Sequence, residues 1–452
     1  MIRKLLRRVF KRETAPLNAP ALIPIALHGI RREDLSPGAR RVCAGLQEAG
    51  YKAYVVGGAV RDLIAGIPPK DYDIATDATP EQVREQFRRA RIIGRRFKIV
   101  HVMVGNETLE VSTFRALHDA DTVTDEHGRV LHDNVYGTQA EDATRRDFTV
   151  NALYYDPATE VVTDYHHGVA DIKQKTLRMI GDPVQRYRED PVRMLRAVRL
   201  AAKLNLIIDP AARKPIVEMS ELLENVPAAR LFDEMLKLLT SGYAVVSLKR
   251  LHSEGLHKGL LPLLDVILNQ PQGEKFVWLS LENTDQRIRD DKPISAGFLF
   301  ATLLWHEVLA NWNARREAGE HTTPALLAAM NEVLEIQAEK LAITRRISAD
   351  ITEIWALQPR FEKRSGKMPY RLIEQPRYRA GYDFLRLRAE SGEINIELPD
   401  WWDAFAHANA EDREGMMQPE KLDPARKRRR RPRKPKVAGE TTAPASNEGS
   451  AD

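Results

Sequence analysis

The stretch GGAVRDLIAGIPPKDYDIATDA, residues 57–78, places two aspartates one residue apart in a segment that otherwise has the pattern of a buried strand. Side chains alternate between the two faces of a strand, so Asp71 and Asp73 are expected to point the same way. Two carboxylates this close repel each other and raise one pKa unless a cation lies between them. Hard divalent cations with oxygen ligands meet this need, and Mg²⁺ combines one or two carboxylates with phosphate oxygens. The pair therefore predicts a site for two metal ions that transfers phosphoryl groups, with both aspartates as catalytic, metal-binding residues.

The residues before the aspartates favour the same chemistry. Gly57 and Gly58 carry no side chain, so backbone N–H groups there can approach a phosphate closely. Arg61 follows with a positive fork that suits a triphosphate. An isolated Asp-x-Asp pair most often caps a turn, but its combination with Gly-Gly and an arginine favours a nucleotide site.

A third carboxylate is expected near such a pair. Glu110 interrupts TLEVSTF, residues 108–114, a predicted strand whose other alternate positions are apolar. We predict Glu110 to be a further catalytic and metal-binding residue, and the alternative is a strand glutamate that faces solvent.

Two arginine-rich stretches extend the predicted site. RRDFTVNAL, residues 145–153, places Arg146 and Asp147 before an apolar run. Asp147 either caps a helix or lies near the sugar and the metals, in which case Arg146 contacts the nucleotide. In RYREDPVRMLRAVRLAAKL, residues 186–204, Asp190 before Pro191 predicts a helix start.

Three arginines share one face of that predicted helix, namely Arg193, Arg196 and Arg199. Such a row is more often a solvated face. Here it follows a Glu-Asp pair, and a carboxylate next to a guanidinium can bind the donor and acceptor edge of a base.

The remaining chain divides into a mixed part and a helical part. Strands are predicted at 53–60, 72–76, 98–105 and 108–114 and a helix at 79–90, whereas apolar periodicity predicts helices at 193–204, 229–241, 298–312 and 324–343. We therefore predict an α+β protein with five regions. They are a basic segment and linker (1–35), an α/β head (36–180), a helical neck (181–260), a helical body (261–420) and a disordered arginine-rich tail (421–452).

Charge is concentrated at the two ends of the 452-residue chain, whose net charge is +5. Residues 1–13 carry +5 and residues 426–452 carry +6, so residues 14–425 carry −6. Nine basic residues in RKRRRRPRKPK (426–436), interrupted by prolines, are typical of a flexible arm that binds polyanions such as nucleic acid.

Hydropathy and cysteine content indicate the compartment. No apolar run reaches the ~18–20 residues that span a bilayer, and the basic N-terminus lacks the apolar core of a secretion signal. The single cysteine, Cys43, excludes an intramolecular disulfide. A cytoplasmic location is therefore expected.

Taken together, these motifs resemble a known family. GG-x-x-R-D with D-x-D, then RRDFT-x-N-A-L, then R-E-D-P-x-R-M-L-R-A-x-R is similar to the class II nucleotidyltransferases of the polymerase-β superfamily, which comprise bacterial poly(A) polymerases and CCA-adding enzymes. RIIGRRFKIVHV (91–102), RYRAGYDFLRLRAE (377–390) and the basic arm resemble the poly(A) polymerases in particular.

The resemblance implies a function and a set of site residues. It implies a polymerase-β-like head that adds AMP from ATP to RNA 3′-hydroxyl ends without a template, with two Mg²⁺ ions. Asp71 and Asp73 match metal-binding positions, and Asp147 and Glu110 match further active-site acids. The nucleotide-binding positions are Gly57, Gly58, Arg61, Arg146, Asp190, Arg193, Arg196 and Arg199.

Partners and alternatives follow from the same resemblance. RNA 3′ ends and ATP are the expected partners, with RNA-decay or RNA-chaperone proteins as candidates, and the sequence does not indicate an oligomeric state. The alternatives are a tRNA CCA-adding enzyme and an inactive RNA-binding adaptor. One departure is DYHHGVADIK (164–173), where a second glycine is expected at His167, and the polar stretch 118–134 has no clear counterpart.

Overall fold

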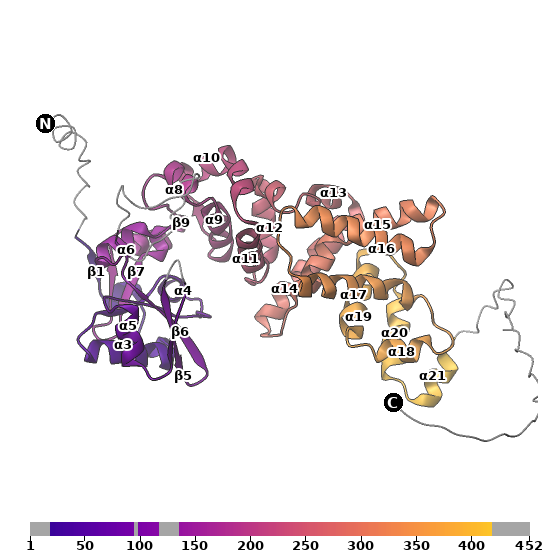
Figure 1. The fold of residues 1–452 in the computed structure, drawn as a ribbon, viewed down its shortest axis with the longest axis horizontal. Helices are drawn as coiled ribbons and strands as arrows, with labels where there is room; N and C mark the ends of the chain where they lie inside the picture. The colour runs from indigo at the N-terminus through magenta and orange to yellow at the C-terminus, as the bar shows by residue number, and fades with distance from the viewer. Residues whose placement is uncertain (1–18, 95–97, 117–134, 418–452) are drawn as a thin grey trace, which may run out of the picture.

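The structure, a computed structural model, describes residues 19–94, 98–116 and 135–417. The expectations for residues 1–13, for the polar stretch 118–134 and for the tail 421–452 lie outside the described residues. The chain extends along one axis, from a sheet-containing head through a helical neck to a helical body (Figure 1). The predicted α+β class is confirmed.

The head is built on an eight-stranded mixed sheet of order β1-β8-β7-β2-β3-β6-β5-β4. Its strands are β1 (Ala21–Ile23), β2 (Ala53–Val56), β3 (Asp73–Thr76), β4 (Ala90–Ile93), β5 (Ile99–Val104), β6 (Glu107–Thr113), β7 (Leu153–Asp156) and β8 (Val161–Asp164). The β3–β6 pair is parallel and the other neighbouring pairs are antiparallel. This parallel pair sets Asp73 directly beside Glu110, so both side chains leave the same face of the sheet.

The two faces of the sheet have different cover. Helices α3 (Pro37–Glu48) and α5 (Pro80–Gln86) pack on one face, where Val42 and Val83 join Ile74 in the core. Asp73 neighbours Ile74 on the strand and therefore points to the opposite face. The remaining elements of the head are α4 (Gly58–Ile64), α6 (Gln139–Arg145), η2 (Thr149–Asn151), α7 (Gly168–Lys173) and β9 (Thr176–Leu177).

Three sequence-based expectations for the head need correction. The described part of the expected linker contains β1, α2 (Ile25–His28) and η1 (Arg32–Asp34), because β1 pairs with the edge strand β8. The strand expected at 53–60 ends at Val56, since Gly57 adopts a positive φ of 67° and α4 begins at Gly58. The helix expected at 79–90 ends at Gln86, because Ala90–Ile93 pairs with β5 instead.

The neck and body are helical, as predicted. The neck comprises α8 (Pro183–Glu189), α9 (Val192–Lys203), β10 (Ile207–Ile208), α10 (Pro210–Glu218), η3 (Ser220–Asn225), α11 (Ala228–Leu239), α12 (Ala244–Ser253) and η4 (Leu256–Gly259). The body comprises α13 (Leu264–Leu268), α14 (Pro271–Arg289), α15 (Ala296–Glu317), α16 (Thr322–Ala338), α17 (Arg345–Phe361), α18 (Met368–Ile373), α19 (Tyr378–Ser391), α20 (Glu397–His407) and α21 (Ala410–Met416). Leu195 and Val198 bury the apolar side of α9, which leaves the arginine side toward the head.

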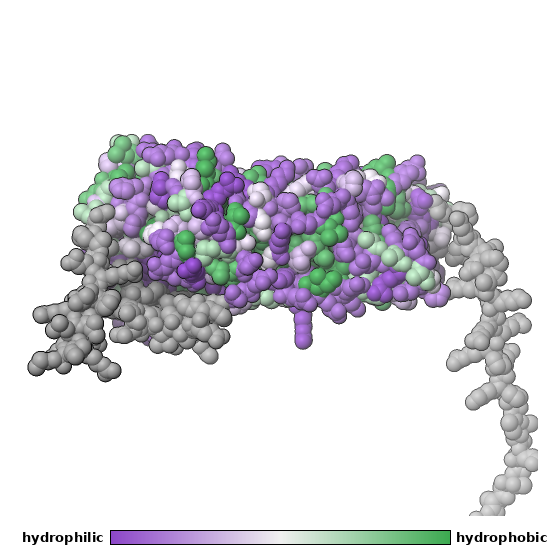
Figure 2. Space-filling model, turned by 90° about the horizontal axis from the view of Figure 1, so that it is seen from above, coloured by the Kyte–Doolittle hydropathy of each residue, from purple (hydrophilic) through white to green (hydrophobic). Residues whose placement is uncertain are grey.

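The face of the molecule in Figure 2 is mostly polar. Hydrophilic residues cover most of it, and several separate hydrophobic patches lie between them. Among the described helices, none combines the length and the apolar character that crossing a bilayer requires.

The turn that begins α7 explains the departure at His167. Asp164 is buried and accepts hydrogen bonds from the backbone N–H groups of His166, Gly168 and Val169 at 3.0–3.1 Å. His167 itself adopts left-handed backbone angles, φ 62° and ψ 27°, which glycine tolerates best. The next residue, Gly168, has no room for a side chain, because a Cβ there would lie 2.2 Å from the carbonyl oxygen of Thr149.

Substitutions at these adjacent positions should have opposite effects on stability. His167→Gly relieves left-handed strain and should raise the free energy of unfolding by about 0.5–1 kcal/mol. Gly168→Ala should lower it by about 1–3 kcal/mol, because the backbone of the turn must move. Equilibrium denaturation of both variants beside the unmodified chain measures the two shifts, and the account of this turn is wrong if both have the same sign.

Candidate active site

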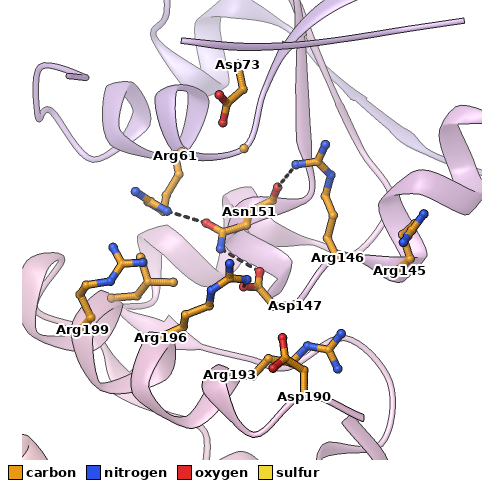
Figure 3. A pocket seen from close by; sticks show the side chains of 13 residues that line it. Arg61, Asp73, Arg145, Arg146, Asp147, Asn151, Asp190, Arg193, Arg196 and Arg199 are labelled. Carbon is orange, nitrogen blue, oxygen red and sulfur yellow. Dashed lines mark hydrogen bonds and ion pairs between the residues drawn. The ribbon is translucent and has the colours of Figure 1, made fainter. Parts of the chain in front are cut away.

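One cavity of about 370 Å³ lies between the head and the neck. The residues that line it are Gly57, Gly58, Arg61, Asp73, Arg145, Arg146, Asp147, Asn151, Asp190, Arg193, Arg196, Arg199 and Leu200. Figure 3 shows Asp73 at one end, Asp190 and Arg193 at the other, and the remaining arginines between them. All eight predicted nucleotide-binding residues therefore line a single cavity, although some 140 residues of sequence separate Gly57 from Arg199.

Asp73 and Asp147 are the predicted catalytic carboxylates that line this cavity. The side chain of Asp73 is open to solvent in the cavity, but partial desolvation by the surrounding protein and the neighbouring Glu110 raise its pKa to about 6; Asp71 adds to the rise and Arg146 opposes it. Asp71 and Glu110 are not among the lining residues, and the three carboxylates do not form a group whose oxygens all lie within 4.8 Å of one another. Asp71 was expected to point the same way as Asp73 from one strand, but β3 begins only at Asp73, so Asp71 lies before the strand.

Glu110 is exposed and has a neighbour that the sequence did not suggest. Its side chain is 55 % exposed, and its Oε1 lies 3.4 Å from Nε2 of His101 on β5. His101 and Asp73 are the direct neighbours of Glu110 on the two adjoining strands, so the three side chains share one face. Glu110 therefore faces solvent, which was the alternative for this position, and it also raises the pKa of Asp73; its role as a catalytic and metal-binding residue stays a prediction.

The Gly-Gly turn and Arg61 form the wall of the cavity on the head side. The N–H of Gly57 donates to the carbonyl of Leu153 (3.2 Å), so it is already used, whereas Gly58 opens α4. Arg61 is buried and donates to Asp62 (2.6 and 2.9 Å) and to Asn151 Oδ1 (2.6 Å). Only part of its guanidinium fork therefore remains for a ligand.

Asn151 joins the parts of this wall. Its side-chain Nδ2 donates to Asp147 Oδ1 at 2.9 Å, and its backbone carbonyl oxygen accepts a hydrogen bond from Nη1 of Arg146 at 3.3 Å (Figure 3). Arg146 is also held by Asp142 and by the hydroxyl of Tyr154. Asn151 lies within RRDFTVNAL, but the sequence alone gave it no role.

Asp147 links the head to the neck. Its Oδ1 also accepts the N–H of Phe148 (2.8 Å), and its Oδ2 lies 3.2 Å from Nη1 of Arg196 on α9. Burial alone would raise the pKa of Asp147, but Arg196 and the hydrogen bonds outweigh it and lower that pKa. Both carboxylate oxygens thus have partners within the protein.

Glu234 on α11 balances the arginine row of α9. It is 4 % exposed, and its carboxylate lies 2.6 Å from Nε of Arg199 and 3.8 Å from Nε of Arg196. A second link between neck and head joins Lys203 to Asp62 at 2.6 Å. The arginine row therefore faces the cavity and not bulk solvent.

The far end of the cavity holds a fixed carboxylate and a fixed guanidinium. Arg230 on α11 places Nη2 3.0–3.1 Å from both oxygens of Asp190. Glu189 accepts from Nη1 of Arg193 at 3.0 Å. Asp190 lies between α8 and Pro191, and its carboxylate turns toward Arg230. Asp190 was predicted to cap the next helix, but its only contact of this kind among the described residues is a long one of 3.4 Å from the N–H of Val192.

Several residues of the site had no signal in the sequence. Arg230 and Glu234 lie one helical turn apart on α11 and reach the cavity residues from some 35–40 positions away. No local pattern relates α11 to α9, and only packing brings the two helices together.

Three family models match separate parts of the chain, in the head, the neck and the C-terminal region. "Poly A polymerase head domain" matches residues 53–178, "Probable RNA and SrmB-binding site of polymerase A" matches residues 205–268, and "Polymerase A arginine-rich C-terminus" matches residues 318–435. The first covers the sheet except β1 and the cavity wall of the head, and the second covers most of the neck.

Relatives of two kinds share this sequence to different extents. Poly(A) polymerase I of Escherichia coli O6:H1 is 44 % identical over 436 residues, which cover 93 % of this chain and 94 % of the relative. A CCA-adding enzyme of Levilactobacillus brevis is 38 % identical over 218 residues, 48 % of this chain and 54 % of the relative.

A solved structure shares the fold. The structure of a tRNA nucleotidyltransferase complexed with a primer tRNA and an incoming ATP analog matches with a TM-score of 0.53 and 21 % identity, and the match covers 80 % of this chain and 99 % of that one. The likeness to poly(A) polymerase I thus extends over nearly the whole chain, whereas the likeness in sequence to the CCA-adding enzyme stops at about half. The chain belongs to the bacterial poly(A) polymerases, the template-independent nucleotidyltransferases that extend RNA with adenylate.

Proposed function

We propose that ATP binds lengthwise in the cavity between head and neck, with its base at Asp190 and Arg193 and its phosphates toward Asp73. The observation that carries this proposal is that one cavity is lined by Asp73 at one end, by Asp190 and Arg193 at the other, and by further arginines between them. The 3′-hydroxyl oxygen of an RNA then attacks the α-phosphorus, the bond to the β-phosphate breaks, and pyrophosphate leaves. RNA grows by one AMP in each cycle.

The base end of the cavity suits adenine. The amino group of adenine is a donor and its neighbouring ring nitrogen an acceptor, which complement the Asp190 carboxylate and the Arg193 guanidinium. Cytosine presents the same pair of groups, so this contact alone does not separate ATP from CTP. The near full-length likeness to poly(A) polymerase I supports adenine.

The arginines carry the electrostatic part of the proposal. A triphosphate brings several negative charges into a cavity whose lining carries six arginines and three aspartates, with Arg196 paired to Asp147 and Arg199 to Glu234. Guanidinium groups bind phosphate oxygens through paired, charge-assisted hydrogen bonds. Asp147, whose oxygens are both engaged, then acts as a positioning residue for Arg196.

Magnesium suits the chemistry of the residues around Asp73. Asp73 lines the cavity and Asp71 and Glu110 lie outside its lining, but all three offer oxygen donors alone, which a hard divalent cation prefers, and positive charge there would offset the mutual repulsion that raises the pKa of Asp73. Two bound Mg²⁺ ions would supply charge that activates the attacking hydroxyl and stabilises the pyrophosphate.

RNA is the proposed acceptor and the cytoplasm the proposed compartment, where ATP and RNA 3′ ends occur together. The basic run RKRRRRPRKPK would add salt-sensitive affinity that does not depend on RNA sequence. Protein partners in RNA decay stay a proposal without a contact surface assigned to them.

Primer extension tests the reaction. A 5′-labelled unstructured RNA with Mg²⁺ and each nucleoside triphosphate in turn should give a long ladder with ATP alone. Asp73→Asn should reduce the rate at least about 100-fold, because removing one preorganised charged group from a phosphoryl-transfer site has effects of this size. Asp77→Asn, an exposed position at the end of the same strand, is the matched control.

Other results would change the assignment. Limited addition from CTP and then ATP on tRNA that lacks its 3′ end would indicate CCA addition. No extension by the unmodified chain would indicate an RNA-binding adaptor.

Because the pKa of Asp73 is raised in the folded protein, replacing Asp73 with asparagine should increase stability at high pH and not at low pH. The folded-state pKa of about 6 lies above the ordinary value of 3.8, so the folded protein loses stability as pH rises between these values. Without divalent ions, Asp73→Asn should therefore melt higher than the unmodified chain at pH 8, and the difference should vanish at pH 4. A lower melting temperature of the variant at pH 8 would contradict the assigned environment.

Arg230 should act on nucleotide binding through Asp190. Arg230→Ala frees the Asp190 carboxylate to rotate, and it should raise the KM for ATP roughly two- to fivefold, the range of a partly exposed ion pair. The value of kcat should change less, because Arg230 lies away from the carboxylate end. Arg188→Ala, exposed on α8, is the control, and equal effects of the two substitutions would exclude the positioning role.

A further inference from the structure

A second group of potential ligands lies outside the nucleotide cavity, where neck and body meet. His252 at the end of α12, His257 in η4 and Asp265 in α13 come from three consecutive elements in the middle of the molecule (Figure 1). One ligand atom from each lies within 4.8 Å of the others, and among the described residues this is the one group of three or more that does so. None of the three lines the nucleotide cavity.

The two imidazoles converge on one carboxylate oxygen. Nε2 of His252 lies 3.0 Å from Oδ1 of Asp265, and Nε2 of His257 lies 2.9 Å from the same oxygen. The rings stack with centroids 4.4 Å apart and planes inclined by 26°. Two nitrogens and one oxygen from three separate backbone elements therefore lie close enough together to bind one ion.

His257 is the independent sign that a ligand is needed. Its exposure is 4 %, its Nδ1 has no hydrogen-bond partner among the described residues, and its Nε2 is paired with Asp265 Oδ1 at 2.9 Å. A buried polar group without a partner costs free energy, so such a group calls for a bound species. His252 and Asp265 are 45 % and 42 % exposed, which leaves the site open to solvent on one side.

The donor set identifies the class of ion. Two imidazole nitrogens with one carboxylate oxygen suit Zn²⁺ and similar transition-metal ions, whereas Mg²⁺ prefers oxygen alone. A tetrahedral ion with bonds of about 2.0–2.1 Å separates its ligand atoms by roughly 3.3 Å, and the two nitrogen–oxygen distances of 3.0 and 2.9 Å are close to this value. Water would take the fourth position on the open side.

We propose that His252, His257 and Asp265 form a binding site for a Zn²⁺-class divalent cation that ties α12, η4 and α13 together at the junction of neck and body. The site is separate from the nucleotide cavity, and the proposal does not depend on the polymerase reaction. Its role is structural, because it closes a short stretch of chain around one ion.

Equilibrium dialysis of the full chain against Zn²⁺ tests the site. Excess Mg²⁺ in both chambers occupies the carboxylates near Asp73. The chain should bind one Zn²⁺ per molecule, and His252→Ala should weaken binding at least about 100-fold, because the loss of an outer-shell partner alone costs 10–100-fold. Since His252 is exposed, its removal should leave the melting temperature in chelator unchanged.

Controls separate this site from others. His407→Ala removes an exposed histidine near Asp403 on α20 and should bind Zn²⁺ like the unmodified chain. Asp265→Asn should behave like His252→Ala. With Co²⁺ in place of Zn²⁺, the strong visible absorption of a tetrahedral ion should appear in the unmodified chain and in His407→Ala, and should be absent from His252→Ala. Absence of stoichiometric binding, or equal binding by His252→Ala, would overturn the proposal.

Discussion

The ion pair between Asp147 and Arg196 is the contact on which the site depends. It joins the head to α9 across the cavity at 3.2 Å, between a buried carboxylate and a partly exposed guanidinium. Together with the Lys203–Asp62 pair, it fixes the arginine side of α9 relative to the head that carries Asp73. Glu234 on α11 lies beside Arg196 and Arg199 and reduces the repulsion between them. The arginine row of α9 can therefore line a cavity, although such a row would ordinarily face water.

This arrangement explains why the chain keeps so much buried charge. A triphosphate needs positive charge at fixed positions, and fixed positions require that each guanidinium have a partner in the protein as well. Arg61 with Asp62 and Arg193 with Glu189 follow the same pattern. The carboxylates therefore hold the guanidinium groups in fixed orientations, and the N–H groups that they do not occupy can bind the phosphates.

Much of this site could be predicted from local patterns. Asp73, the Gly-Gly turn and the arginine row were found because each lies in a short motif whose spacing has a physical meaning. The α+β class followed from periodicity in the same way. The predicted role of Asp71 rested on a strand that begins two residues later, and it stays a prediction.

Other features depend on contacts between distant segments. Arg230 and Glu234 belong to an amphipathic helix, and nothing in that helix shows that it packs beside α9. β1 and β4 are short edge strands whose existence depends on a neighbour that offers free hydrogen-bonding groups. His252, His257 and Asp265 are similarly unremarkable in sequence, and turns bring them together.

A double-mutant cycle on Asp147 and Arg196 tests the central claim that the head and the neck form one site through this pair. The measured quantity is kcat/KM for ATP in Asp147→Asn, Arg196→Gln and the combination. If the two residues act as one unit, the losses should be non-additive, with a coupling free energy of roughly 0.5–3 kcal/mol. Additive losses would contradict the account, because the two side chains would then act independently on either side of the cavity.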